Sequence, residues 1–222
     1  MATNSTPRWI SQQTNPTVSR VTSFAAIFDW DGVIINSEHC HRLGWEALAK
    51  EIQRELPPGY FEASFGRKNA EIIPELLRWS IDHEEISRLS YRKEALYREY
   101  VCAQGIQALP GVRTWLGRLA RAGIPCGIGS STARENIDLS LQGIGWAEFF
   151  QAIVTAEDVK TGKPNPEVFL TVAQRLGASP ERSIVFEDAF VGLVAARRAG
   201  MKRIAVATTN PPASLAEHAD RV

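Results

Sequence analysis

Short apolar segments alternate with helix-forming segments along most of the chain, and this alternation constrains the fold more than any other feature of the sequence. Between these segments, apolar residues recur at helical spacing, and each such stretch ends at a glycine: Gly123, Gly177 or Gly200. Glycine commonly follows the last turn of a helix. The pattern predicts an α/β fold in which a Rossmann-like parallel sheet carries helices on both faces. The segments that favour strands are FAAIF (24–28), IPCGIG (124–129), QAIV (151–154), SIVF (183–186) and RIAVA (203–207).

One long region interrupts this alternation. Between the first predicted strand and the segment ALPGV (108–112), apolar residues recur at helical spacing and no segment favours a strand. The segment DHEE (82–85) is typical of a capping box at the start of a long helix. We therefore predict a discontinuous α/β core made of residues 24–38 and 106–222, with a helical cap domain over residues 39–105.

Length and composition argue against several classes of protein. The 222 residues suffice for one α/β domain with an insertion, and the 25 basic and 25 acidic residues give no net field that attracts nucleic acid or an anionic membrane. No apolar run approaches the roughly 18 residues of a membrane span. We expect no nucleic acid and no membrane among the partners, and a monomer, with a weak dimer as the alternative.

The cysteines and the N-terminal segment bear on the location of the protein. Three cysteines without metal-ligand spacing suit a reducing compartment, so we expect a cytoplasmic protein. Residues 1–23 are rich in Ser and Thr and contain no acid. We interpret this segment as a flexible leader, and an organelle transit segment is the alternative.

The segment FDWDG (28–32) places two aspartates at the end of the first predicted strand. Residues i and i+2 of an extended segment face the same way, so Asp29 and Asp31 can converge on one point while Trp30 points elsewhere. Open parallel sheets bind their ligands at this edge. The sequence thus predicts a ligand site here, and a solvated Asp-Gly turn is the alternative.

Further polar residues follow three other predicted elements. In GIGSSTAREN (127–136), a strand ends and a helix begins at Ser130, Ser131 and Thr132, so these residues form either an anion site or an ordinary helix cap. Lys163 lies in a loop before a helix and offers either a fixed positive charge or a solvated side chain. Glu187 and Asp188 follow another apolar strand and provide oxygen ligands for Mg²⁺, unless Asp188 caps the next helix.

The ordered set of Asp-x-Asp, Ser, Lys and Glu-Asp resembles the four motifs of the haloacid dehalogenase superfamily. The matching segments are FDWDGVIINSE, Ser130, GKPNPEVF and VFEDAFVGLVAARRAGM, within about residues 24–210. The helical insertion resembles the small cap of the beta-phosphoglucomutase-like branch. The resemblance implies the haloacid dehalogenase fold, a Rossmann-like core with an inserted α-helical cap.

The resemblance also implies catalytic roles. Asp29 would attack phosphorus to give an aspartyl-phosphate, and Asp31 would protonate the leaving oxygen and then take a proton from the incoming nucleophile. Ser130 and Lys163 would hold the phosphoryl oxygens. One aspartate must then be ionised and the other protonated; their proximity separates the two pKa values, and bound Mg²⁺ would favour the ionised form of Asp29.

A metal site and a substrate site follow from the same resemblance. Mg²⁺ would be held by the side chains of Asp29 and Asp188 and by the backbone carbonyl of Asp31, with Glu187 nearby. His41 also has the simpler interpretation of a histidine packed on a helix face. The residues expected around the substrate are His41, Trp45, Arg67, Lys93 and Ser131.

The implied function is that of a Mg²⁺-dependent phosphatase acting on a small phosphorylated metabolite such as a sugar phosphate. The second aspartate argues against dehalogenases and phosphonate hydrolases of the superfamily. A phosphomutase is the first alternative, because no motif decides whether water or a substrate hydroxyl discharges the phosphoenzyme. A phospho-acceptor signalling module is the second, although its acids follow a different order along the chain.

Overall fold

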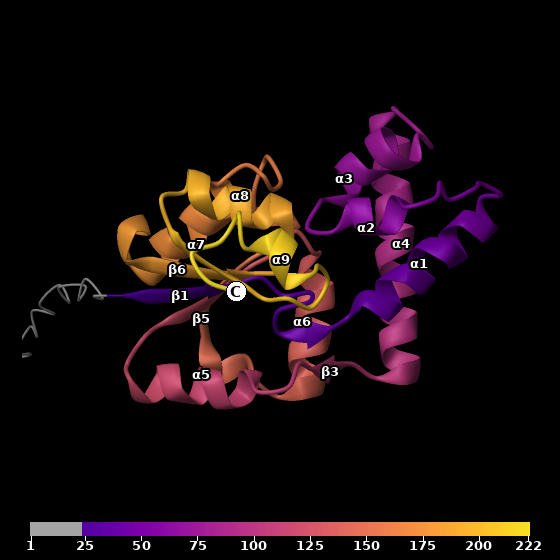
Figure 1. Ribbon diagram of the computed structural model, residues 1–222. Coiled ribbons are helices and arrows are strands. Elements are labelled where there is room, and N and C mark those ends of the chain that lie inside the picture. Colours follow the sequence, from indigo (N-terminus) through magenta and orange to yellow (C-terminus); the bar gives the residue numbers. More distant parts are fainter. Residues whose placement is uncertain (1–23) are drawn as a thin grey trace, which may run out of the picture.

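The computed structural model describes residues 24–222, so the prediction of a leader over residues 1–23 lies outside the described part. Five parallel strands form a sheet in the order β5-β4-β1-β6-β7, with β1 at its centre (Figure 1). Each of the five segments that favour strands contributes one of them, which confirms the predicted parallel sheet. The strands are β1 (Ala25–Phe28), β4 (Cys126–Gly129), β5 (Phe150–Val154), β6 (Ser183–Glu187) and β7 (Lys202–Ala205).

Helices cover both faces of the sheet. Side chains alternate along β1, so Ala25 and Ile27 pack in a core cluster with α7 and α8, whereas Ala26 and Phe28 pack in another with α5 and α6. A strand buried on both faces explains why its sequence is continuously apolar. The core helices are α5 (Val112–Arg121), α6 (Arg134–Ile144), α7 (Glu167–Leu176), α8 (Phe190–Arg198) and α9 (Pro212–Leu215).

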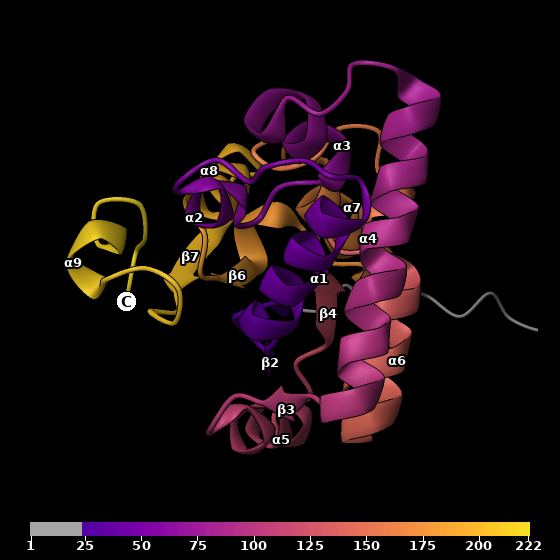
Figure 2. The same ribbon diagram turned by 90° about the vertical axis from the view of Figure 1, so that its right-hand side faces the viewer.

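The predicted helical cap is an insertion between two short strands. β2 (Ile35–Asn36) and β3 (Gln107–Ala108) pair antiparallel, so the chain leaves the core and returns to it side by side. The cap stands beside the core and is joined to it along α4 (Figures 1 and 2). The exact domain boundaries stay a prediction. The cap helices are α1 (Glu38–Glu51), α2 (Tyr60–Ser64), α3 (Asn69–Glu71), a π-helical segment (Ile72–Leu77) and α4 (His83–Gln104).

The cap has a hydrophobic core of its own. Trp45 and Leu48 of α1 pack there with Leu89 of α4, and all three are buried. At the start of α4, the side chain of Asp82 accepts a hydrogen bond from the N–H of Glu85 at 2.8 Å, as expected for the helix start in DHEE. The cap therefore folds around its own apolar side chains. Its polar side chains can then face the α/β core domain.

Two other expectations concern cysteines and membranes. All three cysteines are free, Cys40 and Cys126 buried and Cys102 exposed. Within residues 24–222, we find no helix with the length and apolar character needed to cross a bilayer.

Candidate active site

The carboxyl ends of the central strands bring together three charged side chains. Asp29 directly follows β1, and its N–H donates to the carbonyl of Phe186 in β6 at 2.9 Å. Nζ of Lys163 donates to Oδ1 of Asp29 at 2.5 Å and to Oε2 of Glu187 at 2.7 Å. All three side chains are buried, and Lys163 reaches them from the loop before α7. Residues far apart in the sequence thus form one ion-paired group at the edge where ligands bind.

Two glycines make room for the acids. A Cβ at position 192 would lie 2.0 Å from Oε2 of Glu187, and a Cβ on Gly32, whose φ is +75°, would lie 2.1 Å from Oδ2 of Asp188. Only a residue without a side chain allows the backbone to approach so closely. Oε1 of Glu187 accepts hydrogen bonds from the N–H groups of Asp188 and Ala189 at 3.2 and 3.0 Å. Glu187 is thereby fixed by Lys163 on one side and by backbone on the other.

Three buried carboxylates form a cluster with an excess of negative charge. Asp29, Glu187 and Asp188 each offer an oxygen atom within 4.8 Å of the others. Burial and the neighbouring Glu187 raise the pKa of Asp29 to about 8, and burial and Glu187 also raise the pKa of Asp188 well above its usual value. Lys163 supplies a single positive charge against these acids. The composition and burial of this oxygen donor set fit a divalent cation such as Mg²⁺.

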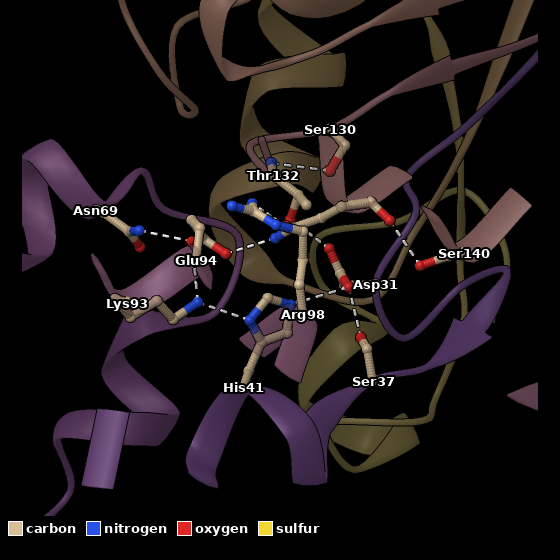
Figure 3. A network of polar contacts seen from close by, with 11 residues as sticks. Asp31, Ser37, His41, Asn69, Lys93, Glu94, Arg98, Ser130, Thr132 and Ser140 are labelled. Carbon is tan, nitrogen blue, oxygen red and sulfur yellow. Dashed lines mark hydrogen bonds and ion pairs between the residues drawn. The ribbon is translucent and has the colours of Figure 1, made fainter. Parts of the chain in front are cut away.

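Asp31 lies in a different environment from Asp29, although both line one cavity. Its Oδ1 accepts hydrogen bonds from the hydroxyl of Ser37 at 2.5 Å and from Nε2 of His41 at 3.1 Å, and its Oδ2 accepts one from the hydroxyl of Thr132 at 2.5 Å (Figure 3). Trp30, between the two aspartates, is fully buried in the core. The strand-like alternation expected for FDWDG is therefore present.

The two aspartates have pKa values shifted in opposite directions. Burial alone raises the pKa of Asp31, but the electrostatic effect of the neighbouring His41 and the hydrogen bonds from His41, Ser37 and Thr132 hold that pKa well below its usual range. The expected separation of the two pKa values is present in the metal-free protein, where the pKa of Asp29 is raised and that of Asp31 is lowered. Asp31 receives three hydrogen bonds, whereas Asp29 has the carboxylate of Glu187 as well as the ammonium of Lys163 beside it. The expectation that bound Mg²⁺ keeps Asp29 ionised stays a prediction.

The loop after β4 carries the three hydroxyl residues of GIGSSTAREN. Ser130 is buried and faces the cavity, and its Oγ accepts a hydrogen bond from the N–H of Thr132 at 3.1 Å. The hydroxyl of Ser131, predicted to bind substrate, donates to the carbonyl of Gly66 in the cap at 2.7 Å. Ser130 therefore remains directed at the cavity, whereas Ser131 joins the core to the cap.

The cavity lies between the edge of the sheet and the cap, and its open space measures about 850 Å³. Lys163 and Glu187 lie behind Asp29 and outside the lining, so Lys163 contacts the site through the carboxylate of Asp29. The predicted site residues that line the cavity are Asp29, Asp31, His41, Trp45, Arg67, Lys93, Ser130, Ser131 and Asp188.

The four cap residues predicted around the substrate differ in how they are held. Nζ of Lys93 lies 2.7 Å from Nδ1 of His41, so these two form a polar pair on the cavity wall. Trp45 is 2% exposed and belongs mainly to the core of the cap. The guanidinium of Arg67 is paired with Glu71 and Glu75 of the cap.

Several residues that shape the site were not in the predicted set. Ser37 fixes Asp31, and its hydroxyl was a visible signal inside FDWDGVIINSE. Thr132 was expected only as part of an anion site, and its hydroxyl also fixes Asp31. Thr209 donates to Oδ2 of Asp188 at 2.8 Å, from a segment that carries no motif. Glu94 contacts Lys93, and the sequence offers only its position next to that lysine as a signal.

Comparison with known proteins agrees with the fold and with the class of enzyme. The family model for haloacid dehalogenase-like hydrolases matches residues 25–200. A chloroplastic 5-amino-6-(5-phospho-D-ribitylamino)uracil phosphatase of Arabidopsis thaliana is 35% identical over 84% of this chain, and the match spans 50% of that relative's length. The fructose-1-phosphate phosphatase YqaB of Escherichia coli is 32% identical over 81% of the chain and 94% of its own length.

A solved structure is similar over most of both chains. The beta-phosphoglucomutase of Clostridium difficile superposes with a TM-score of 0.73 and 28% identity, covering 82% of this chain and 83% of that one.

Fold and site define a hydrolase with an acidic cluster at the edge of a parallel sheet and a helical cap above it. The chain belongs to the haloacid dehalogenase-like hydrolase family. The expected class of enzyme, a phosphatase of this superfamily, is confirmed, and so are the likeness to beta-phosphoglucomutase-like members and the capped α/β fold.

Proposed function

We propose that this protein is a Mg²⁺-dependent phosphatase that hydrolyses a small phosphorylated metabolite through an aspartyl-phosphate on Asp29. The observation that supports this most strongly is the convergence of Asp29, Asp31, Ser130 and Asp188 on one cavity closed by the cap. Carboxylates and a hydroxyl in this arrangement suit the binding and transfer of a phosphoryl group.

Asp29 is the proposed nucleophile. Its carboxylate faces the cavity, and Lys163 fixes it from behind by the contact with Oδ1 at 2.5 Å. A nucleophile held in a buried site needs little reorganisation before it attacks. The hydroxyl of Ser130 would bind a phosphoryl oxygen, because its loop follows a strand at the same edge of the sheet.

The proposed Mg²⁺ site consists of the carboxylates of Asp29 and Asp188 and the backbone carbonyl of Asp31. Glu187 would lie beside the metal site and orient Lys163 through their ion pair. When bound, Mg²⁺ would offset the negative charge of the carboxylates and of the phosphate. Thr209 would orient Asp188 through the hydrogen bond to Oδ2 at 2.8 Å.

Asp31 is the proposed acid and base. In the hydrolytic step the ionised carboxylate of Asp31 would accept a proton from the attacking water, and its lowered pKa favours that ionised form. In the first step it has to deliver a proton to the leaving oxygen. That role requires the contacts with Ser37, His41 and Thr132 to change when substrate binds, because these contacts favour the ionised form.

The substrate class follows from the relatives and the cavity. Relatives with 30% identity or more include phosphatases named for fructose 1-phosphate and validoxylamine A 7'-phosphate. The part of the cavity under the cap combines aromatic side chains, Phe61 and Phe65, with polar ones such as Asn36 and Asn69. This mixture suits a hydroxylated metabolite, so we propose a sugar or sugar-like phosphate.

A phosphomutase remains the second candidate, because the C. difficile beta-phosphoglucomutase is similar over 82% of the chain. Incubation with glucose 1-phosphates separates the two. Free phosphate supports hydrolysis, whereas glucose 6-phosphate formed without phosphate release supports the mutase. A signalling module is disfavoured by the match to a hydrolase family.

We further propose that the protein acts as a monomer in the cytoplasm, as its free cysteines suit a reducing compartment. Sedimentation at micromolar concentration checks the first statement, and the location of the full chain in fractionated cells checks the second.

The experiment that tests the proposed function is a screen of phosphorylated metabolites for phosphate release, with Mg²⁺ or with a chelator present. We expect release from sugar phosphates that depends on Mg²⁺ and that Asp29→Asn abolishes. Release that is equal with the chelator, or equal in the variant, would contradict the proposal.

A further inference from the structure

Glu94 is a buried acid outside the proposed catalytic set. It lies on α4 and is 8% exposed. Its Oε1 accepts hydrogen bonds from Nζ of Lys93 at 3.0 Å and from Nδ2 of Asn69 at 2.6 Å (Figure 3). Its Oε2 accepts a hydrogen bond from Nδ2 of Asn136. A buried carboxylate is costly unless donors compensate it, and here both oxygens are occupied.

On one side, Glu94 joins the cap to the core. Asn136 belongs to the core helix α6 and is fully buried, and its Oδ1 accepts a hydrogen bond from Nη1 of Arg98 at 2.9 Å. Two side chains of α4 therefore hold the two ends of one core amide. Because α6 begins directly after the loop of Ser130, this contact fixes α4 relative to the loop proposed to bind phosphate.

On the other side, Glu94 is connected through Lys93 and His41 to Asp31, the proposed general acid and base. Lys93 is 2% exposed, and its Nζ also lies 2.7 Å from Nδ1 of His41. An ammonium group has only donors, so Nδ1 must accept and Nε2 of His41 carries the ring proton. That Nε2 lies 3.1 Å from Oδ1 of Asp31. A continuous series of contacts thus runs from Asn136 to Asp31.

We propose that Glu94 is a positioning residue for the reaction. It fixes the long side chain of Lys93, and Lys93 fixes the tautomer and orientation of His41 against Asp31. Through Asn136 it also ties this series to the core, so the polar wall of the cap is correctly placed only when α4 and α6 are in contact. The inference rests on the proposed function, because it concerns the support of the proton-transfer step.

Glu94→Gln tests the proposal, with Glu99→Gln as the matched control on the same helix. The glutamine amide has one acceptor oxygen, so it cannot accept from both Lys93 and Asn136 through separate oxygens as the carboxylate does. Lys93 also loses its charged partner. Glu99 is exposed and pairs with Arg92 at 3.0 Å. The readout is kcat/KM for an alkyl ester, fructose 1-phosphate, relative to that for an aryl ester, p-nitrophenyl phosphate, whose leaving group needs little protonation.

We expect Glu94→Gln to lower the alkyl-to-aryl ratio by about tenfold, mainly through kcat, because a misplaced general acid matters most for a poor leaving group. Glu99→Gln should leave the ratio unchanged, and Glu94→Asp should restore part of it. Equal losses on both esters would mean a purely structural role and would overturn the proposal.

A double variant keeps the test valid if the single one is poorly folded. Lys93→Met combined with Glu94→Gln removes both members of the buried pair, a change that proteins tolerate better than the loss of one. The alkyl-to-aryl ratio of the double variant should equal that of Lys93→Met alone if Glu94 acts through Lys93. A ratio lowered by the product of the two single-variant effects would refute this. Absence of phosphate release by the wild-type protein would instead refute the proposed function.

Discussion

Replacement of Lys163 by Met should destabilise the fold by several kcal/mol. The ammonium is fully buried and contacts carboxylates at 2.5 and 2.7 Å, so the variant leaves Asp29 and Glu187 without a cation. Hydrogen bonds to charged groups contribute about 1.5–3 kcal/mol each, which gives about 3–6 kcal/mol for two. Breaking a buried ion pair by removing one partner costs about 3–5 kcal/mol, in agreement with that sum.

Thermal unfolding of the metal-free protein measures this effect. For a chain of this size, about 2–4 °C of Tm corresponds to 1 kcal/mol, so we expect a decrease of about 6–20 °C at about pH 8. The exposed Lys160 of the same loop provides the control Lys160→Met, which should shift Tm very little.

The pH dependence of the Lys163→Met effect separates charge from packing. Because the pKa of Lys163 is raised above its usual value, its stabilisation is complete at any pH below that value. In the variant, protonation of Asp29 relieves the unpaired charge, so the decrease in Tm should be smaller at about pH 5 than at about pH 9, where Asp29, with its pKa of about 8, is mostly ionised in the parent protein. A decrease equal to that of Lys160→Met, or one independent of pH, would refute the reasoning.

Three further predictions concern the acids. Asp29→Asn should abolish phosphate release while Tm at about pH 8 does not fall, because the amide removes a buried acid whose pKa is raised; a lower Tm would contradict this. Asp31→Asn should slow alkyl phosphates by about 10²–10⁴ and aryl phosphates less, and equal losses would argue against an acid at this position. Since the pKa of Asp29 is raised to about 8 from 3.8, metal-free protein should lose stability as pH rises between these values, and Mg²⁺ should reduce that loss; a flat profile in a chelator would count against the acidic cluster.

The fold and the ion-paired end of the site could be predicted from the sequence for a definite reason. The strands are short apolar runs, and the carboxyl ends of parallel strands share one edge, so residues that follow different strands must meet there. Asp29 and Asp188 come together by this rule, each after its own strand. Lys163 required the resemblance to a known family, because a lysine in a loop has no periodicity to place it.

The cap side of the site could not be predicted in the same way. The contact between His41 and Lys93 joins residues 52 positions apart, and that between Glu94 and Asn136 joins residues 42 apart across the cap and the core. Such contacts depend on how the cap helices pack on one another and on the α/β core, which no local sequence pattern encodes. The lowered pKa of Asp31 could not be predicted for a similar reason, since His41 and the hydroxyl groups of Ser37 and Thr132 cause it.

The central claim is that Asp29 carries the phosphoryl group during turnover. Rapid acid quenching, followed by borohydride reduction of the acyl phosphate, marks the phosphorylated side chain for peptide mass spectrometry. We predict that the mark appears at Asp29 only when substrate is present and never in Asp29→Asn. Phosphate release at the usual rate with no mark, or with a mark at another residue, would contradict the account.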